Sequence, residues 1–139
     1  MISDIITRLE RPGVFAQVDL AEDMDALMRG TARPSGTVFV MPYRESADPN
    51  GLATGFRQRV SVQIVTAIIM RINDDPRGAS RARALETYRH AVECALIGQT
   101  PAGAATPLEL IGGEGSALTD NVSLYVQTWE TTRYIVKGP

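Results

Sequence analysis

The sequence predicts an α+β (α/β) protein in which a mostly antiparallel, mixed sheet with long strands is flanked by helices. Three observations lead to this fold class. Residues 56–73, FRQRVSVQIVTAIIMRIN, alternate in polarity like a strand and are rich in β-branched side chains. Residues 122–136 form a second long stretch of this kind. Near the N-terminus and again between residues 76 and 97, apolar side chains recur instead at helical spacing.

The strand predicted over residues 56–73 is unusually long and changes character along its length. Residues 56–63 alternate apolar and polar side chains, and Arg57 and Arg59 lie on the polar face. Residues 64–70 are largely apolar on both faces, so both faces are expected to be covered there. At about 3.3 Å per residue, roughly sixteen residues span about 50 Å, against about 5–6 residues in an average strand. We therefore expect the strand to project beyond its own domain and to offer an assembly surface.

Four elements are predicted before this strand. Ser3 is a candidate N-cap of a first helix, which Pro12-Gly13 would stop. Asp19 with Glu22 has the spacing of a capping box at the start of a second helix. In order, the elements are a helix from Ile2 to Leu9, a strand over residues 14–18, a helix between Asp19 and Gly30, and a strand over residues 37–41.

Residues 42–55, PYRESADPNGLATG, are predicted to form a long loop. They are polar or small and show neither a helical nor a strand period. Asp48-Pro49-Asn50-Gly51 is a strong turn-forming sequence within them. Loops of this length are usually functional or disordered, so we expect this one to be mobile in the free protein and ordered on assembly.

The remaining elements follow the long strand. Asp74-Asp75-Pro76 provides an N-cap and a proline at the first helical position, and Gly98 is the C-terminal stop. No internal repeat and no linker interrupts residues 1–139, so a single domain is expected. In order, the elements are a helix over residues 76–97, a connector over residues 100–106, a strand over residues 108–111, a glycine turn or bulge over residues 112–115, a turn at Asp120-Asn121 and a strand over residues 122–136.

Composition limits the classes of partner. The 139 residues carry a net charge of −2, which gives no overall basic field for nucleic acid or an anionic membrane. The one cysteine, Cys94, excludes a disulfide within the chain and favours a reducing, intracellular setting. No apolar run has the ~18 residues of a membrane span. Asp4 and Glu10 stand where a signal peptide would be basic and then apolar.

Two patterns could be read as catalytic or binding motifs. His90 and Cys94 share a face of the long helix, but no third catalytic partner is identifiable. We therefore interpret His90 as a surface residue and Cys94 as a small apolar residue beside the core. IGGEGS, residues 111–116, lacks the lysine and the following helix of a phosphate loop, so a glycine bulge or hairpin turn is favoured.

Charged and aromatic clusters also have structural explanations. Acidic residues such as Asp19 and Asp74 suit helix N-termini, where capping explains them without a metal. The arginines of residues 77–83 stand where the helix dipole disfavours them, and a solvated face is the better interpretation than contact with an acidic partner. Trp129 and Tyr125 are interpreted as core packing under a helix rather than a stacking platform. No catalytic set remains, so no enzyme, cofactor or metal is predicted.

The order of the segments resembles a known family. The segments are the opening ISDIITRLE helix, the TVFVMPYRESADPNGLATGFRQRVSVQIVTAI block, the RALETYRHAVECALIGQTP helix, the PLELIGGE strand and the closing WETTRYI strand. Together they resemble the tail terminator (tail completion) proteins of long-tailed bacteriophages and related prophage or gene-transfer particles, including the lambda minor tail protein U group. The likeness lies in order and spacing over nearly the whole chain, not in one sharp motif.

This resemblance implies a structural virion protein with an α/β fold and no catalysis or cofactor. It implies six-fold rings that cap the tail tube, terminate tail polymerisation and join the tail to the head connector. The implied partners are further copies of the chain, the tail tube protein and the head-tail connector protein, with DNA only passing through the lumen and no membrane. The implied location is the tail-head junction of the virion, after assembly in the bacterial cytoplasm.

Five charged residues are the candidate subunit or tube interface. Arg57 and Arg59 share the polar face of the long strand, and two like charges there call for acidic partners. Glu45 and Asp48, on the adjoining loop with Arg44, are expected to reach them across a subunit boundary in a ring.

A function from another class stays open at the level of the sequence. The chain could be a small-ligand-binding or regulatory domain, or a cryptic enzyme that uses the face of His90 and Cys94. That alternative expects a monomer or dimer with a concave pocket. If the chain is a tail terminator, we expect larger oligomers whose formation does not depend on Cys94.

Overall fold

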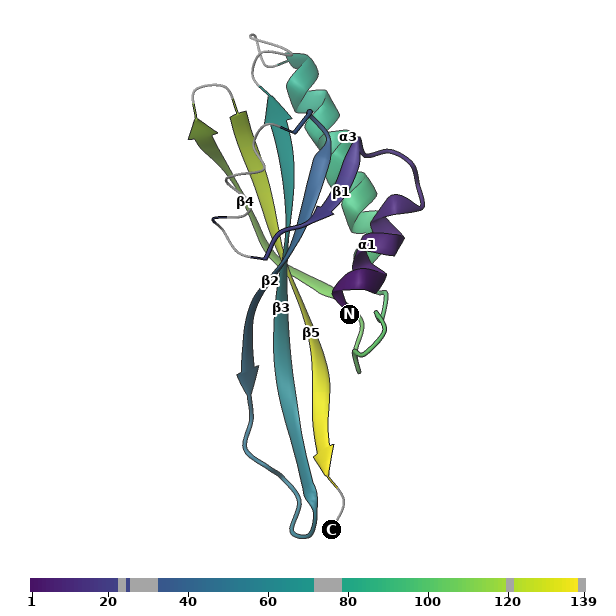
Figure 1. The fold of residues 1–139 in the computed structure, drawn as a ribbon, viewed down its shortest axis with the longest axis vertical. Helices are drawn as coiled ribbons and strands as arrows, with labels where there is room; N and C mark the ends of the chain where they lie inside the picture. The colour runs from purple at the N-terminus through teal and green to yellow at the C-terminus, as the bar shows by residue number, and fades with distance from the viewer. Residues whose placement is uncertain (23–24, 26–32, 72–78, 120–121, 138–139) are drawn as a thin grey trace.

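The computed structural model describes residues 1–22, 25, 33–71, 79–119 and 122–137, and in these residues it shows one mixed sheet with helices on it (Figure 1). The strand order is β1-β2-β3-β5-β4. β1 pairs with β2 in parallel, and the other pairings are antiparallel. The predicted fold class is confirmed. The elements are α1 (Ile2–Glu10), β1 (Gln17–Leu20), β2 (Thr37–Ala47), β3 (Phe56–Arg71), α3 (Ala79–Leu96), β4 (Glu109–Thr119) and β5 (Val122–Lys137).

β3 is the central strand, and its predicted length is confirmed at 16 residues. β5 pairs with all of it, and β2 pairs with the part from Val60 to Ile69. The backbone of β3 therefore finds hydrogen-bonding partners on both sides over most of its length, which a long β-branched segment requires.

Beyond the helices, β2, β3 and β5 continue as a narrow three-stranded ribbon, and the loop between β2 and β3 closes its far end (Figure 1). β1 pairs with β2 only as far as Val40, and β4 begins opposite Glu130, so neither follows the ribbon. The predicted projection of the long strand is thus confirmed. We call this part the arm; it comprises residues 42–47 of β2, the loop 48–55, residues 56–62 of β3 and residues 131–137 of β5.

α1 and α3 cover one face of the wider half of the sheet (Figure 1). Ile5 and Leu9 of α1 are fully buried there. Trp129 of β5 is fully buried in the same cluster, and its Nε1 donates a hydrogen bond to Thr66 Oγ1 at 3.1 Å. Its predicted core role is confirmed, because the ring is buried and its polar atom is satisfied. Tyr125 packs against the same cluster while staying partly exposed.

The opposite face of the wider half carries a second buried cluster, formed by β2, β3 and β5. Val65, Ala67 and Ile69 of β3 belong to it. Ile64 and Ile68 belong to the helix-covered face instead. Burial on both faces explains why the second half of β3 is apolar on both sides, as the sequence indicated.

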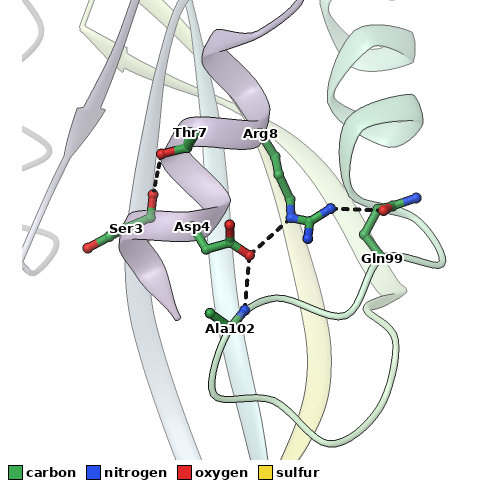
Figure 2. A network of polar contacts seen from close by, with 6 residues as sticks. All are labelled: Ser3, Asp4, Thr7, Arg8, Gln99 and Ala102. Carbon is green, nitrogen blue, oxygen red and sulfur yellow. Dashed lines mark hydrogen bonds and ion pairs between the residues drawn. The ribbon is translucent and has the colours of Figure 1, made fainter.

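A polar network fastens α1 to the segment that follows α3 (Figure 2). Asp4 Oδ2 accepts hydrogen bonds from the Arg8 Nε at 3.1 Å and the Ala102 backbone N–H at 2.9 Å. Arg8 in turn donates to Gln99 Oε1 at 2.8 Å. The Ala102 amide, and secondly the Arg8 guanidinium, hold the pKa of Asp4 below its ordinary value. Within α1, Thr7 donates to the Ser3 carbonyl at 3.0 Å.

Several expectations for the first half of the chain are wrong. The N-cap of α1 is Met1 instead of Ser3, and Ser3 lies inside the helix. The strand predicted over residues 14–18 is displaced, and Asp19 belongs to β1 instead of capping a helix. The backbone at Asp19 pairs with Phe39 of β2, and this strand pairing prevails over the local capping that the sequence favours. The rest of the predicted second helix lies largely outside the described residues.

The predictions for the glycine-rich stretch and for the loop are each confirmed only in part. Of the turn or bulge predicted over residues 112–115, the structure shows the bulge: these residues lie within β4, which has a bulge between Leu110 and Gly112. A Cβ at Gly113 would lie 2.8 Å from the Tyr125 hydroxyl, so any larger residue there would require the tyrosine side chain to shift. Of the predicted loop, residues 42–47 are strand, and only residues 48–55 lie outside regular structure. The turn at residues 120–121 and the start of the long helix before residue 79 lie outside the described residues.

Candidate assembly surface

An ion pair spans the arm on the face that continues from the helix-covered side. Arg133 of β5 donates from Nε and Nη2 to the two carboxylate oxygens of Glu45 on β2, both at 3.0 Å. The two residues lie on either side of β3, close to Val60 and Val62 by strand register. Val60 is only 2% exposed although neither α1 nor α3 covers the arm, which is consistent with the ion pair shielding it. The hydrogen bonds from Arg133 hold the pKa of Glu45 below its ordinary value, against the effect of burial.

The other face of the arm carries Arg57 and Arg59, as predicted from the alternation. Arg59 Nη1 lies 3.7 Å from the Asp48 carboxylate. The Arg57 guanidinium lies 4.0 Å from the ring centroid of Tyr134 on β5, a cation–π contact. Both arginines are exposed. Each nevertheless already has a contact within its own chain.

The structure changes the expected pairing of the five candidate interface residues. Glu45 does not meet Arg57 or Arg59, because it lies on the opposite face of the sheet and pairs with Arg133. Asp48 does meet Arg59, but within one chain rather than across a subunit boundary. Arg44 is exposed and has no ion pair or hydrogen bond within the described part of the chain. Whether any of the five contacts a partner stays a prediction.

Sequence reasoning missed Arg133 and Tyr134. The closing WETTRYI strand carries the alternation that places them on opposite faces of β5. The signal needed to match them with Glu45 and Arg57 was the pairing register of three strands, which alternation within a single strand does not give.

The loop at the tip of the arm is held by Asn50. Its Oδ1 accepts the backbone N–H groups of Leu52 at 3.2 Å and of Arg57 at 2.8 Å. Gln58 Nε2 donates to the Asp48 carbonyl at 3.0 Å, so β3 also holds the start of the loop. The shortened loop therefore has hydrogen bonds of its own, and its mobility in the free protein stays a prediction.

The arm exposes more apolar surface than its polar sequence suggested. Val136 is 66% exposed and Tyr43 is 56% exposed. Apolar surface that a protein leaves exposed in this way commonly marks protein–protein contact sites. The other large apolar residues that the arm exposes are Leu52, Phe56, Tyr134 and Ile135.

A groove of about 400 Å³ lies where the arm leaves the wider half. The chain start, Met1 and Ile2, forms one part of its lining. Pro42 and Tyr43 form another, at the point where β2 has a register shift and pairs irregularly with β3. The Glu45–Arg133 ion pair also lines the groove. The groove has the apolar lining and few polar groups of a contact site, but no set of groups for covalent chemistry.

The His90 and Cys94 face is exposed. Cys94 Sγ lies 3.3 Å from His90 Nε2, and both side chains are on the surface of α3. The interpretation of His90 as a surface residue is confirmed. The interpretation of Cys94 as a residue beside the core is wrong, because its side chain is exposed. Position 94 lies outside the buried stripe of α3 that contains Val92 and Leu96. Among the described residues, no group of three or more His, Cys, Asp or Glu side chains could hold a metal.

Comparison with known proteins decides the family. The family model described as phage tail terminator protein matches residues 2–138. The chain belongs to the phage tail terminator family. It is therefore a structural protein of a phage-type tail, as the resemblance in its sequence indicated.

Solved structures show the same fold for this tail terminator. Eighteen chains match, among them one described as "Virion of native gene transfer agent (GTA) particle". The two share 16% identity with a TM-score of 0.58, and the match covers 99% of this chain and 95% of the other. None of the curated proteins matches the chain. No helix among the described residues has the length and apolar character needed to cross a lipid bilayer.

Proposed function

We propose that this tail terminator assembles into a ring that caps the finished tail tube, ends tail polymerisation and joins the tail to the head connector. The observation that carries this proposal is the arm. A three-stranded ribbon with exposed apolar side chains and no cover from either helix has the features of a surface that is buried in an assembly. The wider half, by contrast, has a buried cluster on each face of the sheet.

The partners of the ring follow from the same proposal. Further copies of the chain, six in a ring by resemblance to the family, would contact one another, the tail tube protein and the connector protein. DNA would only pass through the lumen. A similar chain comes from a gene transfer agent virion, which supports a place in a phage or gene-transfer particle assembled in the bacterial cytoplasm.

Electron microscopy of the purified protein tests the ring directly. We expect annular particles of uniform diameter, and we expect their addition to polymerising tail tube protein to stop tube growth. A protein that stays monomeric at all concentrations and leaves tube length unchanged would contradict the proposal.

We also propose that the protein is not an enzyme, and Cys94 provides the test. Because its thiol is exposed and its hydrogen-bond partner is the surface residue His90, Cys94→Ala should change the free energy of unfolding by no more than about 0.5 kcal/mol. Ring formation should be unchanged in electron micrographs of this variant. Loss of tube termination by a variant that still folds and forms rings would instead support chemistry at the His90–Cys94 face.

A further inference from the structure

We propose that the β2 edge of one copy docks against the β4–β5 edge of a neighbouring copy, with Arg44 meeting Glu109 and Glu130. This inference rests on the proposed ring, because it names the two surfaces by which copies would meet. It goes beyond the ring itself, because it assigns a partner to Arg44 and a role to two carboxylates at the opposite edge of the sheet.

The observation behind it is a row of side chains that crosses the sheet at the base of the arm. Arg44 of β2 is paired with Gln63 of β3, Gln63 with Glu130 of β5, and Glu130 with Glu109 of β4. Cross-strand partners project from the same face of a sheet. One row thus has a cation at one edge and two carboxylates at the other.

The carboxylate end of this row is unfavourable in an isolated subunit. Glu109 and Glu130 are directly opposite each other, and like charges in that position destabilise a sheet. Neither carboxylate has an ion pair or a hydrogen bond within the described part of the chain. The same is true of Arg44, which is separated from Glu130 by β3 and forms no ion pair with it, although the two line one polar hollow.

Both sheet edges are open to a neighbour near this row. β1 pairs with β2 only to Val40, so the β2 edge beyond it has no strand partner among the described residues. On the other side β4, the outermost strand, begins at Glu109. An open strand edge is a ready surface for another chain.

A second copy of the chain is the occupant that these charges select. In a head-to-tail contact, opposite edges of two copies meet, so Arg44 of one copy lies beside the two carboxylates of the next. An isologous contact would place the same edge on both sides and bring like charges together. Head-to-tail contacts repeated by rotation close into rings.

Charge reversal tests the contact. Arg44→Glu makes both edges acidic, and Glu130→Arg brings an arginine against the Arg44 of the next copy, so each variant alone should assemble worse than the wild type. We expect the concentration for half-maximal ring formation, measured by sedimentation velocity, to rise about tenfold or more in each. An equimolar mixture of the two variants should form rings again, because unlike copies can alternate around a ring with an even number of subunits.

Arg83→Glu is the matched control, since it makes the same charge change on an exposed position of α3 away from both edges. A thermal unfolding curve for each variant separates misfolding from lost contacts. If Glu130→Arg does not fold, Glu109→Arg on the exposed edge strand replaces it. If the wild type forms rings and Arg44→Glu and Glu130→Arg form them equally well, the inference is overturned while the ring proposal stands. Two defective variants whose mixture stays unassembled would also overturn it. A wild-type protein that never forms rings would overturn both.

Discussion

At the scale of single residues, a few polar side chains connect segments that are far apart in the chain. Asp4 is bonded to Ala102, 98 residues further along, and so holds α1 beside the loop that follows α3. Glu45 and Arg133, 88 residues apart, do the same for the two outer strands of the arm. A carboxylate that accepts two well-formed hydrogen bonds stabilises the fold more than an exposed ion pair does.

We predict that Asp4→Asn lowers the free energy of unfolding by about 1 kcal/mol at neutral pH, because charge-assisted hydrogen bonds become neutral ones. The pKa of Asp4 is lower in the folded than in the unfolded protein. Its contribution is therefore present above the unfolded-state pKa and is lost as the pH falls through the folded-state pKa. Urea unfolding at pH 7 and in acid should show the difference between variant and wild type shrinking in acid.

Glu10→Gln serves as the control for this variant, since it removes a carboxylate from an exposed position of the same helix. It should have little effect at either pH. An equal loss for both variants would show that the helix responds to charge in general and not to the bond with Ala102.

Residue-scale predictions from the sequence were right about faces and wrong about partners. Alternation correctly placed Arg57 and Arg59 on one face of β3, because that follows from the strand backbone alone. It could not show that Glu45 faces the other way, since a register shift after Pro42 intervenes and Glu45 had been taken as part of a loop. Partner choice between strands depends on register, which is a tertiary property.

At the scale of elements, β2 shows where local sequence is insufficient. Residues 42–47 begin with a proline and are mostly polar, which locally favours a loop. They form a strand because β3 extends alongside and offers its backbone. Proline is tolerated at the bulge, on an edge without a further strand partner. The long strands, by contrast, could be predicted, since their periodicity and β-branched content agree.

The loop of residues 48–55 yields a prediction at this scale. Asn50→Ala removes the acceptor for two backbone N–H groups and should loosen the tip of the arm. Limited proteolysis of the free subunit should then cut within residues 48–55 several times faster than in the wild type. The thermal unfolding midpoint should stay nearly constant, because the core lies in the wider half.

Gln99→Ala is a suitable comparison, because it removes a polar side chain from a different exposed loop. It should leave cleavage of the arm unchanged. If Asn50→Ala were cut no faster than the wild type, Asn50 would not be what holds the loop.

At the scale of the whole molecule, the protein divides into a wider half with buried clusters on both faces and an arm with almost none (Figure 1). The sequence indicated this division through the change in β3 from one polar face to two apolar faces. It did not indicate how many strands follow β3 into the arm, since that depends on the lengths of β2 and β5 in the folded sheet. Nor could it show which apolar residues the arm leaves exposed.

The polar face of the arm gives the last prediction. Arg57→Glu combined with Arg59→Glu removes one exposed ion pair and one cation–π contact, so the free energy of unfolding should fall by no more than about 1–2 kcal/mol. If this face contacts a neighbouring copy or the tail tube, the double variant should form rings, or cap tubes, only at higher protein concentration. A ring repeats each contact at every interface, so small losses accumulate.

Sedimentation velocity beside a thermal unfolding curve separates the two effects. Arg11→Glu with Arg83→Glu makes the same total charge change at two exposed positions, one just after α1 and one on α3, and it should leave assembly unchanged. Assembly and tube capping like those of the wild type in the arm variant would exclude Arg57 and Arg59 from the interface. A large fall in its unfolding temperature would instead show that both arginines stabilise the fold of the free subunit, and a defect in assembly would then follow from the loss of folded protein.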